Sequence, residues 1–154
     1  MSTYPPPPPT AAGPTPTGAS GPRANFGQRL VAALIDGILV GIVAGIVEAI
    51  SRPVGGVVAL ALGIAYYGYL EGSPSGQTVG KRAMSIRVID FRSGGSIGFG
   101  RAVLRYFAKI ISTIPCLLGY FWMLWDGEKQ TWHDKIASDV VVPTDAYPVE
   151  NWPG

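Results

Sequence analysis

The stretch LVAALIDGILVGIVAGIVEAI, residues 30–50, decides the fold of this chain, because it is long and apolar enough to cross a bilayer. At about 1.5 Å per residue, a helix of this length spans roughly 30 Å, the thickness of the hydrocarbon core. Asp36 lies inside the stretch and Arg29 directly precedes it. An ionised carboxylate buried in hydrocarbon costs several kcal/mol. The stretch therefore predicts an integral membrane protein with an intramembrane polar site.

The composition agrees with one membrane domain. Hydrophobic residues make up 47% of the chain and charged residues 14%, against about 25% charged residues in soluble domains. The net charge of +2 is too small to indicate nucleic acid as a partner. The single cysteine, Cys116, lies in an apolar run. It excludes an intrachain disulfide and is typical of a small hydrophobic side chain.

Three segments differ in composition. Residues 1–24 are rich in proline, threonine and glycine, so we expect a disordered, cytoplasmic tail. Residues 25–143 hold the apolar segments and form the transmembrane domain, and residues 144–154 are expected to be a flexible tail. Because the first apolar stretch exceeds the roughly 7–15 residues of a signal-peptide core, we expect it to be retained as an anchor.

The first two spans are predicted to form an antiparallel helical hairpin. Helices are expected over residues 28–50 and 54–70, joined by a tight turn at Ser51-Arg52-Pro53. Small residues recur every four positions along the first helix and predict a ridge that allows close helix–helix packing. This ridge consists of Ala33, Gly37, Gly41, Gly45 and Ala49.

The third apolar segment leaves two alternatives open. Residues 110–125 are apolar, with Pro115 near the middle. They form either one span kinked at the proline or a re-entrant segment that follows an interfacial helix. Just before them, basic residues recur every four positions, a stripe that suits contact with anionic lipid headgroups. The stripe consists of Arg101, Arg105 and Lys109.

Short β-prone runs lie on both sides of the third segment. Residues 84–91 alternate apolar and polar side chains, and residues 139–142 form a second run. If the two strands pair, both lie on one side of the membrane and the third segment cannot cross fully. The first turn carries only Arg52, whereas residues 72–100 carry several lysines and arginines. This bias predicts that the N-terminus and the 72–100 loop face the cytoplasm.

The candidate polar site consists of residues distant in sequence. Arg29 and Asp36 are seven positions apart, so they share a helix face but lie about 10 Å apart along the axis. Each is therefore expected to meet a partner from another segment, with Asp134 and the basic residues of 81–109 as candidates. Asp36 either binds a cation or exchanges a proton, or it is a structural clamp between helices.

The remaining motifs do not indicate catalysis. Residues 76–82, GQTVGKR, lack the glycine spacing and the Ser or Thr of a phosphate-binding loop. His133 is the one histidine and has no second ligand at metal-binding spacing. With no nucleophile–base set visible, we expect no cofactor, no metal and no enzymatic activity.

Several of these motifs, in this order, resemble the RDD family of small bacterial membrane proteins. They are RLVAALID at 29–36, GQTVGKR at 76–82, IRVID at 86–90, QTWHD at 130–134 and DVVV at 139–142. The family is named for an arginine and two aspartates, which Arg29, Asp36 and Asp134 match. The chain departs at Ser138-Asp139, where members often have Gly-Thr. The resemblance implies a multi-pass protein of the bacterial inner membrane, with transport of ligands, including cation–proton antiport for some members.

The sequence thus predicts an all-α membrane protein: a transmembrane hairpin, a third spanning or re-entrant helix and a short cytoplasmic β-like loop. We expect either a small transporter of ions or small ligands that uses Asp36, or a non-transporting scaffold that binds a partner protein or anionic lipid. Three spans in one monomer can hardly enclose a pathway, so a transporter is expected to be a homo-oligomer.

Overall fold

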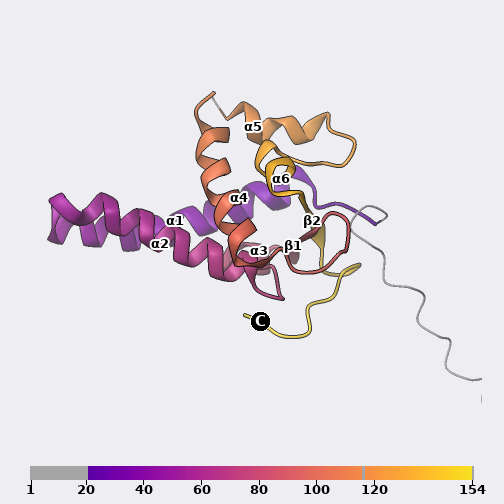
Figure 1. Ribbon diagram of the computed structural model, residues 1–154, viewed down its shortest axis with the longest axis horizontal. Helices are drawn as coiled ribbons and strands as arrows, with labels where there is room; N and C mark the ends of the chain where they lie inside the picture. The colour runs from indigo at the N-terminus through magenta and orange to yellow at the C-terminus, as the bar shows by residue number, and fades with distance from the viewer. Residues whose placement is uncertain (1–20, 116, 154) are drawn as a thin grey trace, which may run out of the picture.

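A computed structural model describes residues 21–115 and 117–153. It shows a long helical hairpin that projects from a lobe of short helices and two strands (Figure 1). The hairpin is formed by α1 (Phe26–Ile50) and α2 (Arg52–Gly72). Most of the predicted N-terminal tail, and Cys116, lie outside the described residues. The predominantly helical fold with a small strand pair confirms the predicted fold class.

The hairpin follows from local sequence signals. A capping box between Asn25 and Gln28 begins α1, where each side chain accepts a hydrogen bond from the other residue's backbone amide. Ser51 lies in extended conformation between the helices, and Pro53 occupies the first turn of α2, where its missing N–H is not needed. Both helices are long and apolar enough to cross a membrane, with mean hydropathies of 2.6 and 1.5 over their most apolar windows.

The two predicted strands pair within the lobe. β1 (Ile86–Asp90) and β2 (Asp139–Pro143) are antiparallel, with Val88 opposite Val141. Val88 and Val141 belong to one buried apolar cluster with Ala32 of α1, which joins the strand pair to the base of the hairpin. The short helices α3 (Val79–Ala83) and α6 (Trp132–Ala137) each lead into one of the strands.

Strand pairing decides how the third apolar segment runs. The segment comprises α4 (Gly98–Thr113), α5 (Leu118–Phe121) and the 3-10 turn η1 (Trp122–Leu124), with a bend of 111° after α4. It leaves the lobe after β1 and returns to it before β2 (Figure 1). Because β1 and β2 are paired, the segment begins and ends on the same side of the hairpin base. The third segment is therefore a sharply bent helix pair and not one straight span.

The small-residue ridge does not make a helix contact within this chain. Its five residues are all exposed, and a Cβ built on Gly37, Gly41 or Gly45 would meet nothing within 4 Å. Close approach instead occurs on α2, where a Cβ on Gly63 would lie 2.2 Å from the Tyr106 hydroxyl of α4. Within one chain, therefore, it is a small residue of α2, and not the ridge on α1, that allows close helix packing, and the helix that approaches is α4.

The predicted flexible C-terminal segment packs against the lobe up to residue 153. Tyr147 is buried together with Ile89, Val140 and Val142. The indole of Trp152 donates to the Gln77 carbonyl at 3.1 Å. Burial of Tyr147 and the hydrogen bond of Trp152 compensate for the ordering of this polar segment, which composition alone does not reveal.

Candidate functional site

Asp36 is buried where α1, α2 and α3 meet. Its Oδ1 accepts hydrogen bonds from the Tyr66 hydroxyl at 2.7 Å and the Gly80 amide at 2.8 Å. Its Oδ2 accepts one from the Thr78 hydroxyl at 2.6 Å. A Cβ on Gly80 would lie 2.1 Å from the Ala32 carbonyl oxygen, so the glycine lets α3 approach α1 closely. Asp36 thereby ties the loop after α2 to the first span.

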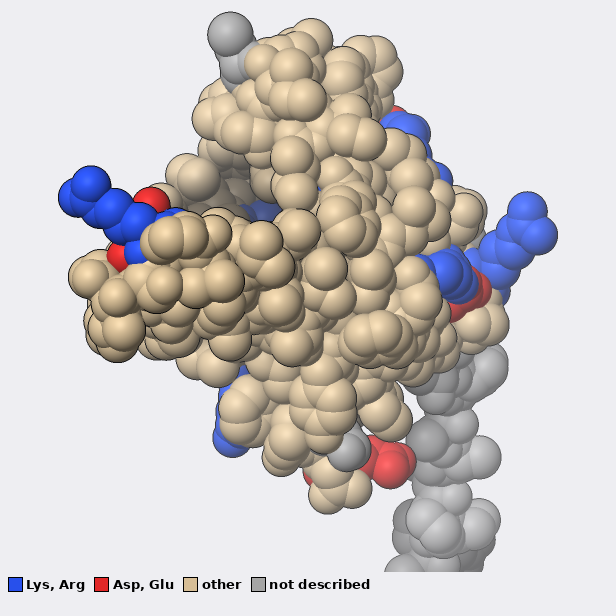
Figure 2. Space-filling model, turned by 60° about the vertical axis from the view of Figure 1, so that its left-hand side comes forward, with Lys and Arg blue, Asp and Glu red and all other residues tan. Residues whose placement is uncertain are grey.

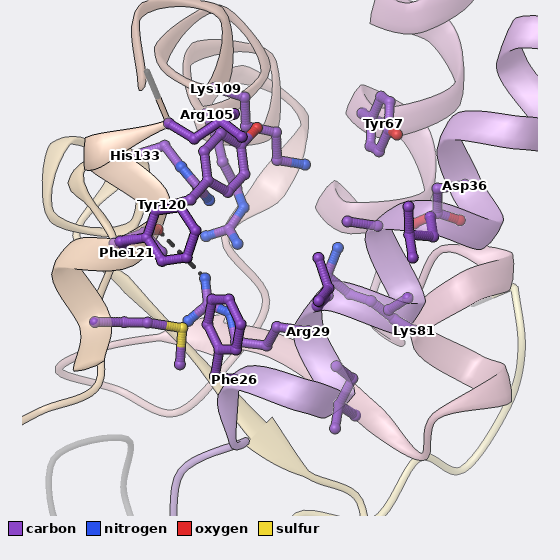
Figure 3. Close-up of a pocket in the computed structure, with 18 residues that line it drawn as sticks. Phe26, Arg29, Asp36, Tyr67, Lys81, Arg105, Lys109, Tyr120, Phe121 and His133 are labelled. Atoms are coloured by element: carbon purple, nitrogen blue, oxygen red, sulfur yellow. Dashed lines mark hydrogen bonds between the residues drawn. The ribbon is translucent and has the colours of Figure 1, made fainter. Parts of the chain in front are cut away.

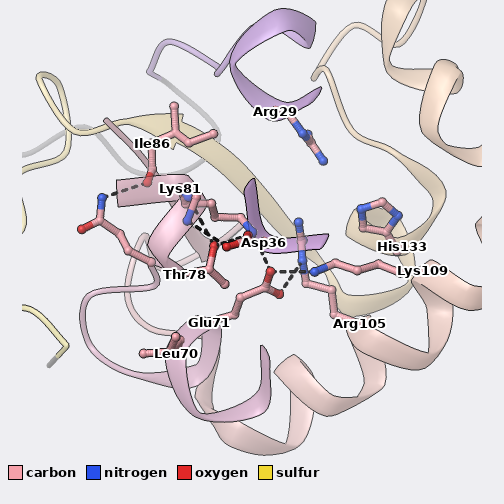
Figure 4. Close-up of polar contacts among 12 residues, drawn as sticks. Arg29, Asp36, Leu70, Glu71, Thr78, Lys81, Ile86, Arg105, Lys109 and His133 are labelled. Atoms are coloured by element: carbon pink, nitrogen blue, oxygen red, sulfur yellow. Dashed lines mark hydrogen bonds and ion pairs between the residues drawn. The ribbon is translucent and has the colours of Figure 1, made fainter. Parts of the chain in front are cut away.

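The Glu71 carboxylate, at the end of α2, forms ion pairs with three basic side chains (Figure 4). Its Oε1 accepts from Lys81 Nζ and from Lys109 Nζ, both at 2.6 Å. Its Oε2 lies 3.0 Å from Arg105 Nε. The Glu71 side chain is 0% exposed, so its charge is held in a low-dielectric site where unpaired ions are strongly destabilising.

Arg105 continues the network toward α6 and β2. Its Nη1 lies 2.5 Å from Asp134 Oδ1 and also contacts Asp139. Arg29 Nη2 binds the other oxygen of Asp134 at 2.6 Å. Arg105 therefore connects α2, α6 and β2, and Arg29 adds the start of α1.

The electrostatics of the lobe follow from this pairing. Burial by itself raises the pKa of Asp134, but Arg105 and Arg29 hold it well below its usual range. Asp139 and Asp134 both contact Nη1 of Arg105. Burial and repulsion from Asp134 raise the pKa of Asp139. Burial lowers the pKa of His133 well below its usual value, so its imidazole is neutral at pH 7.

A cavity of about 310 Å³ lies beside these groups, between the start of α1, the end of α2, α4 and α5 (Figure 3). Its polar lining includes four cationic residues: Arg29, Lys81, Arg105 and Lys109. Asp36 also lines it, while Phe26, Phe121 and several leucines supply apolar walls. Phe26 stacks on Phe121 with ring centroids 5.6 Å apart, which ties α5 to the start of α1.

The structure brings two of the three family-like residues into direct contact. Arg29 pairs with Asp134. The seven-residue separation of Arg29 and Asp36 had predicted a partner for Arg29 from another segment, with Asp134 as a candidate. Asp36 is held by neutral donors of α2 and by the start of α3. Arg29 and Asp36 line the same cavity.

The interpretation of the basic stripe as a lipid-headgroup surface needs correction. Arg105 is buried in ion pairs, Lys109 reaches Glu71, and Arg101 binds Asp90 and the carbonyl oxygen of Ala137. The stripe faces inward because carboxylates from α2, α6 and β2 compensate the burial of its charge. The apolar side of α4 faces outward instead, with Leu104, Phe107 and Ile111 exposed.

Sequence reasoning missed Glu71 as the centre of the network. It was visible only as a carboxylate at the end of the second span, next to aromatic residues of the membrane boundary. The signal that points to it is the stripe of Lys and Arg at four-residue spacing, which requires acidic partners if it is buried. Thr78 and Asp139 were likewise within recognised motifs but without assigned partners. Within residues 21–115 and 117–153, no group of three or more His, Cys, Asp or Glu side chains is arranged to hold a metal ion.

The apolar hairpin and the charged base define a membrane-type protein. The RDD family pattern matches residues 23–138, and the chain belongs to the RDD family. It is similar to a proline-rich antigen homolog of Mycobacterium tuberculosis, with 40% identity over 85 residues, covering 53% of this chain and 35% of the relative. The proline-rich antigen of Mycobacterium leprae is 37% identical over 87 residues, 56% of this chain and 34% of the relative.

A third relative is the uncharacterized protein YxaI of Bacillus subtilis, which is 33% identical over 86 residues, 56% of each chain. The matched part of this chain spans about a third of the length of the mycobacterial relatives. No solved structure matches the chain.

Proposed function

We propose that this chain is a non-transporting scaffold of the bacterial cytoplasmic membrane, with α1 and α2 as its two crossing helices. The carrying observation is the set of three hydrogen bonds to Asp36, which come from α2, from Gly80 of α3 and from Thr78 before it. A carboxylate satisfied in this way joins the cytoplasmic lobe to the hairpin. A cation or proton that binds Asp36 must compete with these donors for the carboxylate oxygen that it occupies, which opposes a carrier role for Asp36.

The orientation proposed for the scaffold places the lobe, the N-terminus and the base of the hairpin in the cytoplasm. The bias of lysine and arginine toward the lobe supports this orientation. The exposed ridge of Ala33, Gly37, Gly41, Gly45 and Ala49 is available to a second copy of the chain, which supports a homo-oligomer. The scaffold performs no catalysis in this proposal and binds an anionic lipid or a partner protein.

Ion flux in liposomes tests the proposal. Purified full-length chain, reconstituted in liposomes, is expected to move no more sodium, potassium or protons under imposed gradients than empty liposomes do. An added ionophore verifies that the gradients are intact. Flux that disappears in the Asp36→Asn variant, while the variant still inserts and folds, would contradict the scaffold role.

Transport is the second candidate, because Asp36 lines the cavity together with Arg29 and Lys81. An intramembrane carboxylate at a cavity is a typical position for a proton or ion site. In that case an oligomer formed through the α1 ridge would complete the pathway. The same flux measurement separates the two functions, because only the transporter predicts Asp36-dependent flux.

A further inference from the structure

We propose that the cavity at the base of the hairpin binds the phosphate headgroup of an anionic phospholipid from the surrounding bilayer, with Lys81 and Lys109 as the phosphate-binding residues. This inference deepens the proposed scaffold role, because it names the ligand class and the site. It uses the cavity between α1, α4 and α5 rather than the outward surface of the basic stripe.

Lys81 and Lys109 give the cavity wall N–H donors that can bind an anion. Lys81 and Lys109 donate to the same oxygen, Oε1 of Glu71, although each ammonium has three N–H groups. Lys109 Nζ also lies 4.1 Å from the centre of the Tyr67 ring. One carboxylate thus serves two lysines and, through its other oxygen, Arg105. Both lysines line the cavity and retain donors for a second anion.

The carboxylates that pair with these cations, Glu71, Asp134 and Asp139, are not part of the cavity lining. Among the described residues that line the cavity, Asp36 is the acidic one, and both of its oxygens already accept hydrogen bonds. Arg29 adds a further cation to the lining. A phosphate group is a strong acceptor for ammonium and guanidinium donors, so the wall is complementary to it.

The mouth of the cavity distinguishes a lipid from a free anion. Leu30 and Leu34 of α1 and Leu117 and Phe121 at α5 line it and are between 40% and 56% exposed. On a membrane helix these exposed side chains contact acyl chains. A lipid held by its headgroup at the lysines can therefore extend its chain along an apolar path. Figure 2 shows a broad face with few charged atoms and blue atoms inside a hollow on it.

The level of the site along the hairpin fits a headgroup. The cavity lies at the start of α1 and the end of α2, where a spanning hairpin meets the membrane boundary. Its volume of about 310 Å³ is at the small end of the roughly 300–1,000 Å³ of ligand sites. This suits a headgroup rather than a whole lipid.

Native mass spectrometry of the full-length chain in detergent tests the site, with dioleoyl phosphatidylglycerol and dioleoyl phosphatidylcholine as probes. The first bound lipid is expected to favour phosphatidylglycerol by about tenfold or more, since each nearby lysine contributes about fivefold. Lys109→Met should reduce the preference about fivefold. Lys135→Met makes the same charge change at an exposed lysine outside the cavity and should leave the preference unchanged.

A second pair of variants avoids the Glu71 network. Ala33→Phe fills the cavity from an exposed position on α1, whereas Ala49→Phe places the same side chain on the same ridge away from it. Loss of phosphatidylglycerol preference in Ala33→Phe, with wild-type preference in Ala49→Phe, supports the site even if Lys109→Met fails to fold. Equal binding of both lipids to wild type, or wild-type preference in Ala33→Phe, would overturn it.

Competition with inorganic phosphate distinguishes a lipid site from a site for a free anion. If millimolar phosphate alone displaces phosphatidylglycerol from the wild-type chain, the site belongs to a free anion and the lipid assignment is wrong. No displacement supports the lipid. Flux measured in liposomes reports separately on the scaffold role, so failure of either proposal can be told from failure of the other.

Discussion

Replacement of Asp36 by asparagine should lower stability while leaving ion flux at the level of empty liposomes. Asparagine can keep Oδ1 for Tyr66 and Gly80 and turn its amino group toward Thr78. The Thr78 hydroxyl can rotate to accept, so no partner is necessarily orphaned. What is lost is the charge assistance, since hydrogen bonds to charged groups contribute about 1.5–3 kcal/mol and neutral ones about 1 kcal/mol.

The expected loss for Asp36→Asn is about 2 kcal/mol, because relief from burying a charge offsets part of the three weakened bonds. For a chain of this size, that corresponds to a fall in melting temperature of about 4–8 °C. Asp36→Leu leaves three donors without an acceptor and should cost about 3–6 kcal/mol. Glu48→Gln, at an exposed acidic position near the far end of α1, is the matched control and should melt like wild type.

Melting temperature and flux should be measured on the same reconstituted samples. An Asp36→Asn variant that melts within about 1 °C of wild type would refute the clamp, since a surface substitution changes stability by about 0.5 kcal/mol or less. If that variant also abolishes a wild-type flux, Asp36 is a transport residue.

Four further outcomes are expected. In a cysteine-free background, Ser85→Cys should resist labelling by membrane-impermeant reagents in intact cells, because the lobe is placed in the cytoplasm; external labelling would reverse the orientation. Gly41→Leu should disrupt the oligomer in detergent far more than Gly41→Ala does, and equal behaviour would place the ridge against lipid. Ser138→Gly should raise the free energy of unfolding by about 1 kcal/mol, because Ser138 has φ of 53° in the left-handed region; an unchanged melting temperature would argue against strain there. The folded-state pKa of Asp134 lies below its unfolded value, so the Asp134 carboxylate contributes fully to the free energy of unfolding above about pH 4. This contribution is lost on further acidification, and Asp134→Asn should flatten that acidic part of a plot of unfolding free energy against pH.

The membrane character and the outline of the fold are local properties of the sequence. A long apolar helix, a turn with proline at the next helix start and two alternating β-prone runs each depend on neighbours within a few residues. These features predicted the hairpin and both strands. The partner of Arg29 was also predicted, because a charge at the edge of a span requires an opposite charge from another segment.

The sequence by itself determined that this protein is a membrane hairpin with strand-forming loops and the motifs of the RDD family. Only the tertiary structure decided which way the basic stripe faces, which cations share Glu71, and that Gly37, Gly41 and Gly45 of the ridge face open space within the chain. Helical periodicity shows that three side chains share a face, but the direction of that face depends on segments about 30 residues or more away in sequence. Arg105 is buried because Glu71, Asp134 and Asp139 converge on it, and that convergence exists only after the hairpin, α6 and β2 have packed together.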